Sequence, residues 1–339
     1  MKKISLHDSI GLALCHDITR IVPGKEKVRA FKKGHIVRTE DLPMLRDLGK
    51  EHVYIWEDAD NLIHEDEAAL RLAKAASGPG ITFGEPNQGK VSLKVAYSGL
   101  LEIDALRLAQ INSIEGIVLA SVHGSQAVAA GTVAAGTRVI PIAIEKEKLE
   151  AAEQICCSSS PLISVKPFIP LRVGIVTTGN EVYSGRIKDG FCAVLQQKLA
   201  SYQGEFMGQV LVPDDASLIS AQIKKFINDG ADLVFVTGGM SVDPDDVTPT
   251  GIKQTGAEVV FYGVPVLPGS MLMLAYLGNV PICGVPGCVM FNRTTSLDLI
   301  LPYIFSGQRV NPSQIVSLGY GGLCQECPVC HYPNCAFGK

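Results

Sequence analysis

Residues 233–248, LVFVTGGMSVDPDDVT, decide the fold of the second half of the chain. They begin with an apolar, β-branched run of the kind that fully buried strands show. The run breaks at Gly238 and Gly239 and turns through Ser241. Three aspartates follow, Asp243, Asp245 and Asp246. A buried strand, a glycine turn and acidic residues in succession present carboxylates at the carboxyl end of a sheet strand, where ligands of open α/β sheets lie.

The segments around this stretch repeat its pattern. RVGIVTTG (172–179) is predicted as a buried strand with a glycine turn, and DGFCAVLQQKLASYQG (189–204) as a helix that Asp189 caps. Further strands are predicted at FMGQVLV (206–212), MLMLAY (271–276) and VPICGV (280–285), and one long buried helix at 286–307. Strands that alternate with helices at this spacing predict the α/β class with a mainly parallel sheet.

The remaining chain divides by composition and pattern. We predict an α+β region at 1–78, a β-rich region with one helix at 79–160, a linker at 161–170, the α/β domain at 171–308 and a Cys-rich tail at 309–339. In the first region, residues 20–38 carry seven Lys/Arg and one acid. This basic stretch is either a cradle for an anionic ligand or a solvated face.

Composition excludes several classes of protein. The net charge of −4 over 339 residues gives no global basic footprint, so we expect no nucleic-acid partner. No run approaches the ~20 apolar residues that a membrane span needs. Six of the ten cysteines are scattered and four lie in the last 16 residues, a distribution typical of a metal site and not of a disulfide framework. We therefore expect a cytoplasmic protein.

Three loops are expected to meet at the carboxyl edge of the predicted sheet. The first is Thr177, Thr178, Gly179, Asn180 and Glu181; the second contains Gly238, Gly239 and Ser241; the third is a pair of Pro-Gly turns, Pro268-Gly269-Ser270 and Pro286-Gly287. Glycine turns expose backbone N–H groups that hold phosphate, and carboxylates bind Mg²⁺. Any one loop could be only a turn, but together they predict a phosphorylated ligand with a divalent ion.

The ordered set of motifs resembles a known family. TTGNEV, IKDGFCAVLQQKLASYQGE, VPDDASLISAQI, VTGGMSVDPDDVT, a PG turn and a closing GVPG segment are similar to the molybdopterin-binding domain family over roughly 171–308. That family includes molybdopterin adenylyltransferases and molybdotransferases. The resemblance implies a three-layer α/β/α domain that binds molybdopterin, or its adenylylated form, with Mg²⁺.

The resemblance also implies roles for single residues. Glu181 matches the Glu of the family's TTGDE loop, Asp246 the Asp that closes its GG-x-S-V-x-x-x-D loop, and Asp189 the Asp before the first helix. On this basis Asp246 binds Mg²⁺, which polarises a pyrophosphate for cleavage, and Glu181 orients the pterin or the metal. The implied reaction is Mg-dependent insertion of molybdate. Related proteins are often oligomers, so a homo-oligomer is expected.

The sequence departs from the family in two places. Asn180 stands where the family has Asp, and the Met-Asp-Gly-Tyr-Ala motif of molybdotransferases does not occur in residues 1–170. The alternative is therefore a non-catalytic carrier or sensor of molybdopterin, which docks on a molybdoenzyme or a maturation partner through its Cys-rich tail. A third interpretation is a hydrolase of pyridine nucleotides or ADP-ribose with a related domain.

The tail carries four closely spaced thiols. They are arranged as Cys324-x2-Cys327-x2-Cys330-x4-Cys335, on a segment rich in Gly and Pro that can wrap around one metal centre. Four cysteines satisfy a structural Zn²⁺ site. The run C-x2-C-x2-C also resembles the spacing in bacterial ferredoxins, although those continue with x3 and here the spacing is x4. The sequence leaves Zn²⁺ and a 4Fe–4S cluster open.

Overall fold

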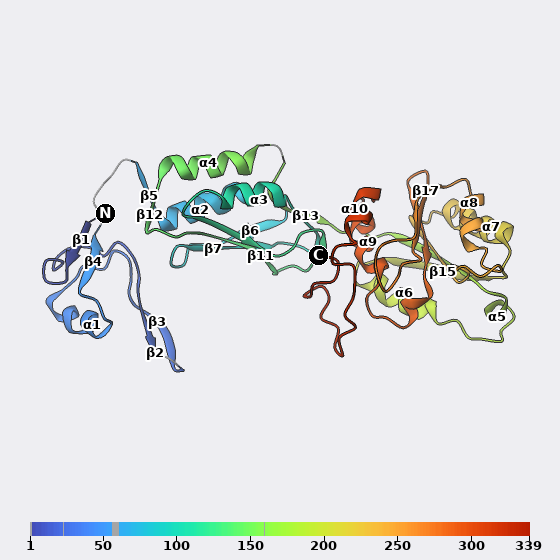
Figure 1. The fold of residues 1–339 in the computed structure, drawn as a ribbon, viewed down its shortest axis with the longest axis horizontal. Coiled ribbons are helices and arrows are strands. Elements are labelled where there is room, and N and C mark those ends of the chain that lie inside the picture. The colour runs from blue at the N-terminus through green and yellow to red at the C-terminus, as the bar shows by residue number, and fades with distance from the viewer. Residues whose placement is uncertain (1, 23, 56–60, 159) are drawn as a thin grey trace. The chain divides into compact units, whose positions relative to one another are not determined.

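The computed structural model describes residues 2–22, 24–55, 61–158 and 160–339. The chain forms two compact units (Figure 1). Unit 1 comprises Met1–Tyr97, Glu102–Gly124 and Ala129–Val165, and unit 2 comprises Ser98–Leu101, Ser125–Val128 and Lys166–Lys339. The predicted domain limits at 78 and 308 stay predictions. The segment predicted as a linker at 161–170 holds a strand, β13 (Ile163–Pro167).

Unit 1 begins with a small α+β cluster. Its elements are β1 (Lys2–Ser5), β2 (Ile18–Val22), β3 (Glu26–Phe31), η1 (Thr39–Asp41), α1 (Leu42–Asp47) and β4 (His52–Ile55). The pairs β1–β4 and β2–β3 are both antiparallel. The sequence predicts one helix here, which Thr39 caps and which runs through Leu48, but the structure divides it into η1 and α1. Pro43 explains the division, because it has no N–H to donate to the carbonyl of Thr39. The sequence HVYIW at 52–56 predicts a strand, of which β4 forms the part that the structure describes, and Trp56 lies outside the described residues.

The rest of unit 1 is a sheet with helices on one side (Figure 1). Its elements are β5 (Leu62–His64), α2 (Glu65–Ala76), β6 (Ile81–Phe83), β7 (Lys90–Val95), α3 (Ala105–Asn112), β9 (Ile117–Ser121), β11 (Val133–Val139), β12 (Ala143–Glu145) and α4 (Lys146–Cys157). The strand order is β6-β7-β11-β9, and β12 pairs with β5. One helix was predicted for residues 79–160, but this region holds both α3 and α4, so the prediction missed α4. Its buried Leu149, Ala152 and Cys156 follow helical spacing, a signal present in the sequence.

Unit 2 is built on a six-stranded sheet. The strands are β14 (Arg172–Thr178), β15 (Glu205–Val212), β16 (Leu233–Thr237), β17 (Glu258–Tyr262), β18 (Met273–Leu277) and β19 (Val280–Val285), in the order β15-β14-β16-β19-β18-β17. The first four strands in this order are parallel, β18 runs antiparallel to them, and β17 pairs antiparallel with β18 and therefore runs in the direction of the first four. Two segments from earlier in the chain also belong to this unit: Ser98–Leu101, which includes the start of β8 (Gly99–Ile103), and Ser125–Val128, which includes β10 (Gln126–Val128). β8 and β10 pair antiparallel.

Helices cover both faces of this sheet. They are α5 (Asn180–Tyr183), α6 (Phe191–Ala200), α7 (Ala216–Asn228), α8 (Thr248–Gln254), η2 (Gly287–Met290), α9 (Ser296–Phe305) and α10 (Pro312–Ser317). Residues of α6 and α9 pack against one face, and residues of α7 and α8 against the other. The predicted three-layer α/β/α architecture is confirmed. Within the described ranges, no helix combines the length and the apolarity that crossing a bilayer demands.

The end of unit 2 differs from prediction. Residues 286–307 do not form one helix, because a capping box starts α9 only at Ser296. The Thr295 hydroxyl accepts from the N–H of Leu297, while the Asp298 carboxylate accepts from the N–H of Thr295 at 2.8 Å. Pro286 instead precedes η2. The expectation that Pro286-Gly287 sits at the N-terminus of the long helix was therefore wrong.

Candidate functional site

Two glycines bring the loop after β16 against the loop after β14. Gly238 and Gly239 have φ angles of +85° and +53°, which side chains rarely adopt. A Cβ on Gly238 would lie 2.3 Å from the carbonyl oxygen of Thr178. The backbones of the two loops can meet this closely only because position 238 has no side chain.

A set of buried hydroxyls fixes the same two loops. The Thr237 hydroxyl donates to Thr177 Oγ1 at 3.0 Å, and Gln209 Nε2 donates to that oxygen at 2.8 Å. Thr178 Oγ1 lies 3.0 Å from Thr248 Oγ1, at the start of α8. Thr177 and Thr178 are 1% and 2% exposed. Their hydroxyls are thus used inside the fold, where they position the loops that follow β14 and β16.

Asp189 holds the start of α6. Its carboxylate accepts the backbone N–H groups of Phe191 and Cys192, each at 3.0 Å, and also accepts from Gln209 Nε2 at 2.8 Å. The predicted capping role of Asp189 is confirmed. Gln209 thereby ties the helix start to Thr177 at the end of β14.

A cavity of about 540 Å³ opens at the carboxyl edge of the sheet. We call it the sheet-edge cavity. The predicted residues that line it are Gly238, Gly239, Ser241, Asp246, Pro268, Gly269, Ser270, Pro286 and Gly287, and its other lining residues are Phe191, Met240, Leu267, Met271, Val285 and Cys288. Two of the three predicted loops therefore line the cavity and the third does not. The glycine loop after β16 and both Pro-Gly turns line the cavity, whereas Thr177, Thr178, Gly179, Asn180, Glu181 and Asp189 do not.

The turn at Pro268-Gly269 is held by α9. Ser296 Oγ donates to the carbonyl of Gly269 at 2.6 Å, and the Ser296 N–H donates to the carbonyl of Pro268 at 3.1 Å. Gly269 has a φ of +115°, and a Cβ there would lie 2.2 Å from Ser296 Oγ. This turn is one rigid wall of the sheet-edge cavity, because it is bonded to a capped helix.

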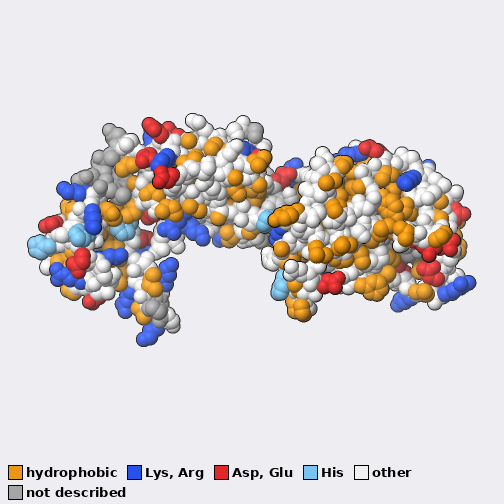
Figure 2. Space-filling view, in the orientation of Figure 1, with side chains coloured by type: hydrophobic (Ala, Val, Ile, Leu, Met, Phe, Trp, Pro, Cys, Tyr) orange, Lys and Arg blue, Asp and Glu red, His pale blue; other side chains and the backbone are white. Residues whose placement is uncertain are grey.

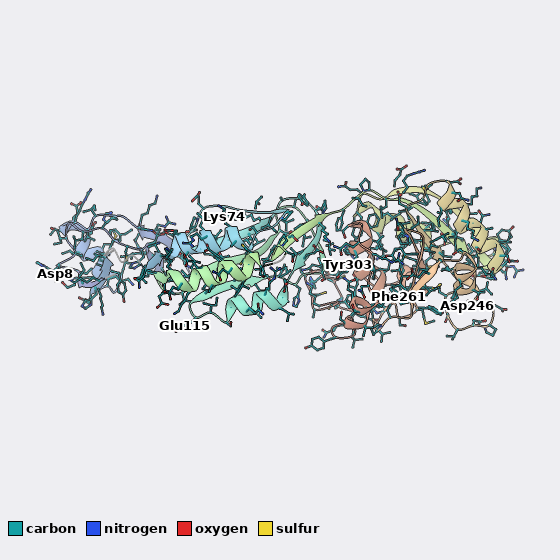
Figure 3. The ribbon with its side chains drawn as sticks, turned by 90° about the horizontal axis from the view of Figure 1, so that it is seen from above. Asp8, Lys74, Glu115, Asp246, Phe261 and Tyr303 are labelled. Atoms are coloured by element: carbon teal, nitrogen blue, oxygen red, sulfur yellow. The ribbon has the colours of Figure 1, made fainter. Side chains whose placement is uncertain are left out.

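Acidic side chains gather beside the cavity. Figure 2 shows them at the end of unit 2 around α5, and Figure 3 shows Asp246 at this outer end. Burial raises the pKa of Asp214, and the nearby carboxylates of Glu181, Asp246 and Asp245 raise it further. The Asn180 N–H, by contrast, donates to Asp214 Oδ2 at 2.9 Å and lowers that pKa. The four carboxylates repel one another through space, which is the electrostatic setting that a bound cation relieves.

Some residues of this site were missed from the sequence. Asp214 follows β15 as Glu181 follows β14, so its place after a parallel strand was a usable signal. Tyr262 is the last residue of the edge strand β17, which runs in the direction of the four parallel strands, so its place at a strand end was a usable signal as well. Its hydroxyl donates to the carbonyl of Met240 at 3.0 Å. Burial and Asp246 raise the pKa of Tyr262. Phe191 enters from α6, and only the tertiary structure places it at the cavity.

The four tail cysteines line a second cavity, of about 450 Å³, which we call the tail cavity. Within the part of the chain that the structure describes, no three His, Cys, Asp or Glu side chains are grouped as metal ligands are. The thiol of Cys330 lies 3.4 Å from Thr294 Oγ1. This contact, followed by the backbone N–H of Tyr332, lowers the pKa of Cys330.

The basic stretch at 20–38 is partly neutralised within unit 1. Arg29 pairs with Asp17 at 2.9 Å and donates to Asn87 Oδ1 at 2.8 Å. Lys33 lies 3.5 Å from the carboxylate of Asp66. Arg29 and Lys33 therefore have structural partners within unit 1. Binding of an anionic ligand by the basic stretch stays a prediction.

Two family descriptions match this chain. Residues 3–57 match a domain of unknown function, and residues 174–306 match the "Probable molybdopterin binding domain". The molybdopterin molybdenumtransferase of Haemophilus influenzae is 30% identical over 174 residues, which are 46% of this chain and 41% of that protein. The protein of the same name from Synechococcus elongatus is 27% identical over 185 residues, or 51% and 43%. The chain thus spans less than half the length of these relatives.

A solved structure with a similar domain is the tungsten cofactor synthesizing protein MoaB from Pyrococcus furiosus. It is 20% identical, with a TM-score of 0.33, over 40% of this chain and 93% of that one. The family match covers β14 through α9, the elements that build the sheet-edge cavity. The resemblance that the loop motifs carry is confirmed, since residues 174–306 match the description of a probable molybdopterin binding domain.

Proposed function

We propose that the sheet-edge cavity binds molybdopterin, or its adenylylated form, together with Mg²⁺. The observation that carries this proposal is the coincidence of the cavity with the acidic group. Gly238, Gly239 and Gly269 line the cavity with backbone alone, and Asp246 belongs both to its lining and to the carboxylates around Asp214. Backbone N–H groups in such turns suit a phosphate, and the adjacent carboxylates suit a hard divalent cation.

The residues have different tasks in this proposal. Asp246 and Asp214 hold Mg²⁺, which supplies Lewis-acid polarisation of the pyrophosphate when it is bound. Glu181 orients the ligand from α5. Phe191, Met240 and Met271 provide apolar surface for the pterin. Thr177, Thr178 and Asp189 act through the loops and the helix that they position.

The reaction proposed is Mg-dependent insertion of molybdate into molybdopterin. The support is the set of carboxylates at the edge of the sheet and the similarity to relatives named molybdopterin molybdenumtransferase, over part of their length. The tail cysteines are proposed to hold a metal centre of the same chain, zinc or an iron–sulfur cluster. A cytoplasmic location and a homo-oligomer belong to the proposal as well.

Pterin fluorescence tests the binding step. The purified full chain is titrated with molybdopterin anaerobically, separated from free ligand, oxidised, and assayed for fluorescent pterin. We expect bound pterin with the wild type and a loss of at least tenfold in affinity with Asp246→Ala when Mg²⁺ is present. Asp243→Ala is the matched control, since Asp243 is in the same loop but is absent from the cavity lining. No bound pterin under saturating ligand would refute the proposal.

One observation favours the alternative, a carrier or sensor that binds without catalysis. Asn180 replaces the family's loop acid, and its Oδ1 accepts the N–H of Asp214 at 3.3 Å. This side chain therefore serves the structure of the loop and adds no charge. Cofactor maturation with Glu181→Ala and Asp246→Ala separates the two functions. If both variants mature the cofactor as the wild type does while pterin still binds, the chain is a carrier.

A further inference from the structure

The tail of the chain is part of the folded core of unit 2. Phe337 is 4% exposed and belongs to the core that α6 and α9 share, and Tyr332 and Cys335 pack against it. The Tyr332 hydroxyl donates to the carbonyl of Asp298 at 3.3 Å, and the Gly338 N–H donates to that of Gly321 at 2.9 Å. These contacts hold the tail in a defined loop against α9, so its cysteines have fixed positions.

All four cysteines of the motif line one cavity. Cys324, Cys327, Cys330 and Cys335 line the tail cavity, whose opposite wall is Phe291–Thr294, the segment between η2 and α9. Cys327 is exposed and the other three are partly exposed. They differ from Cys156 and Cys283, which are fully buried within helix and sheet packing. Cys324 and Cys335 also pack against the core of unit 2, yet all four cysteines keep exposed surface at one cavity, as a set of metal ligands requires.

The size of the tail cavity and the spacing of the cysteines favour a cluster over a single ion. A tetrahedral Zn²⁺ ion draws four sulfurs to about 2.3 Å from one point. Among the residues that the structure describes, no three His, Cys, Asp or Glu side chains are grouped to hold a single ion. All four tail cysteines line a cavity of about 450 Å³. A 4Fe–4S cluster needs a larger space than one ion, because each of its thiolates binds a separate iron atom, and the C-x2-C-x2-C spacing resembles that of bacterial ferredoxins.

We propose that Cys324, Cys327, Cys330 and Cys335 ligate one 4Fe–4S cluster in the tail cavity. Each thiol loses its proton as it binds an iron atom, so cluster binding releases four protons and needs no change of oxidation state. Arg293 lines the same cavity and offsets the negative charge of the four thiolates. Thr294 Oγ1, at 3.4 Å from Cys330 Sγ, is placed to donate to a ligating sulfur.

The cluster also braces the sheet-edge cavity, a consequence that rests on the proposed function. Leu267 connects the tail to the sheet-edge cavity, because it lines that cavity and is also bonded to the tail. Its N–H donates to the carbonyl of Gly322 at 2.8 Å, and its carbonyl accepts from the Cys324 N–H at 2.8 Å. On the other side, Cys288 lines the sheet-edge cavity, and its carbonyl accepts from the N–H of Asn292 at 2.8 Å. Movement of the tail is therefore transmitted to two walls of the ligand cavity.

Anaerobic reconstitution of the full chain with sulfide and an equimolar mixture of Fe²⁺ and Fe³⁺, the oxidation states that a brown 4Fe–4S cluster contains in equal parts, tests the cluster. We expect a brown protein with broad visible absorption and about four iron and four sulfide per chain. Cys330→Ser and Cys335→Ser should each lose at least half of the iron. Cys157→Ser, which replaces an exposed cysteine of α4 outside the cavity, should retain all of it. A colourless protein with one tightly held zinc per chain, or no metal held by the wild type, would overturn the proposal.

Pterin titration then separates this inference from the function on which its second part rests. Tighter binding by at least threefold in the reconstituted protein than in the metal-free protein supports the bracing. Equal affinity overturns the bracing and leaves the cluster in place. If neither form binds pterin, the proposed function fails, whereas the iron content and absorption still decide the cluster.

Discussion

Replacement of Gly238 by Ala tests the close approach of loops on which the candidate site depends. The φ of +85° at this position costs an alanine about 1–2 kcal/mol. The new Cβ would also lie 2.3 Å from the carbonyl oxygen of Thr178. That oxygen belongs to backbone and cannot rotate away, so the loop after β14 must shift, at a cost of roughly 1–3 kcal/mol more.

Gly256 is the matched control for the backbone strain. It has a φ of +84° after α8 in the same unit, and a Cβ there would have no heavy atom within 4 Å. Gly256→Ala should therefore show the strain alone, about 1 kcal/mol. Gly238→Ala should lower the free energy of unfolding by about 2–5 kcal/mol, the sum of strain and displacement.

Thermal melting followed by circular dichroism measures the difference. At roughly 2–4 °C per kcal/mol for a domain of this size, Gly238→Ala should reduce Tm several degrees more than Gly256→Ala. Gly238→Ala should also lose pterin binding at temperatures where it is folded, because the loop that lines the sheet-edge cavity has moved. Equal Tm reductions in the two variants would refute the close approach and the site geometry built on it.

Three further substitutions test the electrostatics and the internal bonding of unit 2. Asp214→Asn should raise Tm at pH 7 but not at pH 3, and it should abolish stabilisation by Mg²⁺. The pKa of Asp214 is raised in the folded state, so the folded protein binds this proton more tightly than the unfolded chain does. The folded protein therefore loses stability as the pH rises from the ordinary pKa of an aspartate through the raised one. A lower Tm of the variant at pH 7 would contradict this. Lys198→Met should lower the free energy of unfolding, measured by chemical denaturation, by about 3 kcal/mol. It removes the cation that lies 2.6 Å from the carboxylate of Asp298, where the two side chains are only 10% and 13% exposed. An unchanged denaturation midpoint would contradict this expectation. Thr178→Val should cost about 1–3 kcal/mol, since it removes the partner of the fully buried Thr248 hydroxyl, while Ser184→Ala, at an exposed hydroxyl on the following turn, should cost less than half of that.

Local sequence patterns predicted the unit that carries the candidate site. Apolar β-branched runs that end in glycine identified β14 and β16, and their alternation with helices predicted the parallel sheet of unit 2. The cap that Asp189 provides for α6 and the glycine turn after β16 were predicted for the same reason, and the binding roles of these residues stay predictions. Each depends on interactions between residues close together in the chain.

Predictions failed where distant contacts compete with a local pattern. Residues 286–295 are apolar enough for a helix, yet the capping box of Thr295 and Asp298 delays α9. The Ser296 contacts to Pro268 and Gly269 then use the start of that helix as a clamp for a turn almost thirty positions earlier. No local pattern in residues 286–295 indicates that Ser296 bonds the turn at Pro268-Gly269. The apolar pattern alone therefore placed the start of α9 too early in the chain.

The sequence by itself determined which residues are available: the glycine turns, the acidic strand ends and the four thiols of the tail. Their types and short spacings are local properties that any fold must accommodate. Only the tertiary structure decided which of them meet. It placed Asp246 in the lining of the sheet-edge cavity and left Glu181 and Asn180 outside that lining. It brought Asp214 and Tyr262 near Asp246. It also set the four tail cysteines around a second cavity, with the Cys324 N–H bonded to the carbonyl of Leu267. The physical reason is that sheet order and helix packing, which arise from contacts between distant parts of the chain, determine which loop ends share an edge.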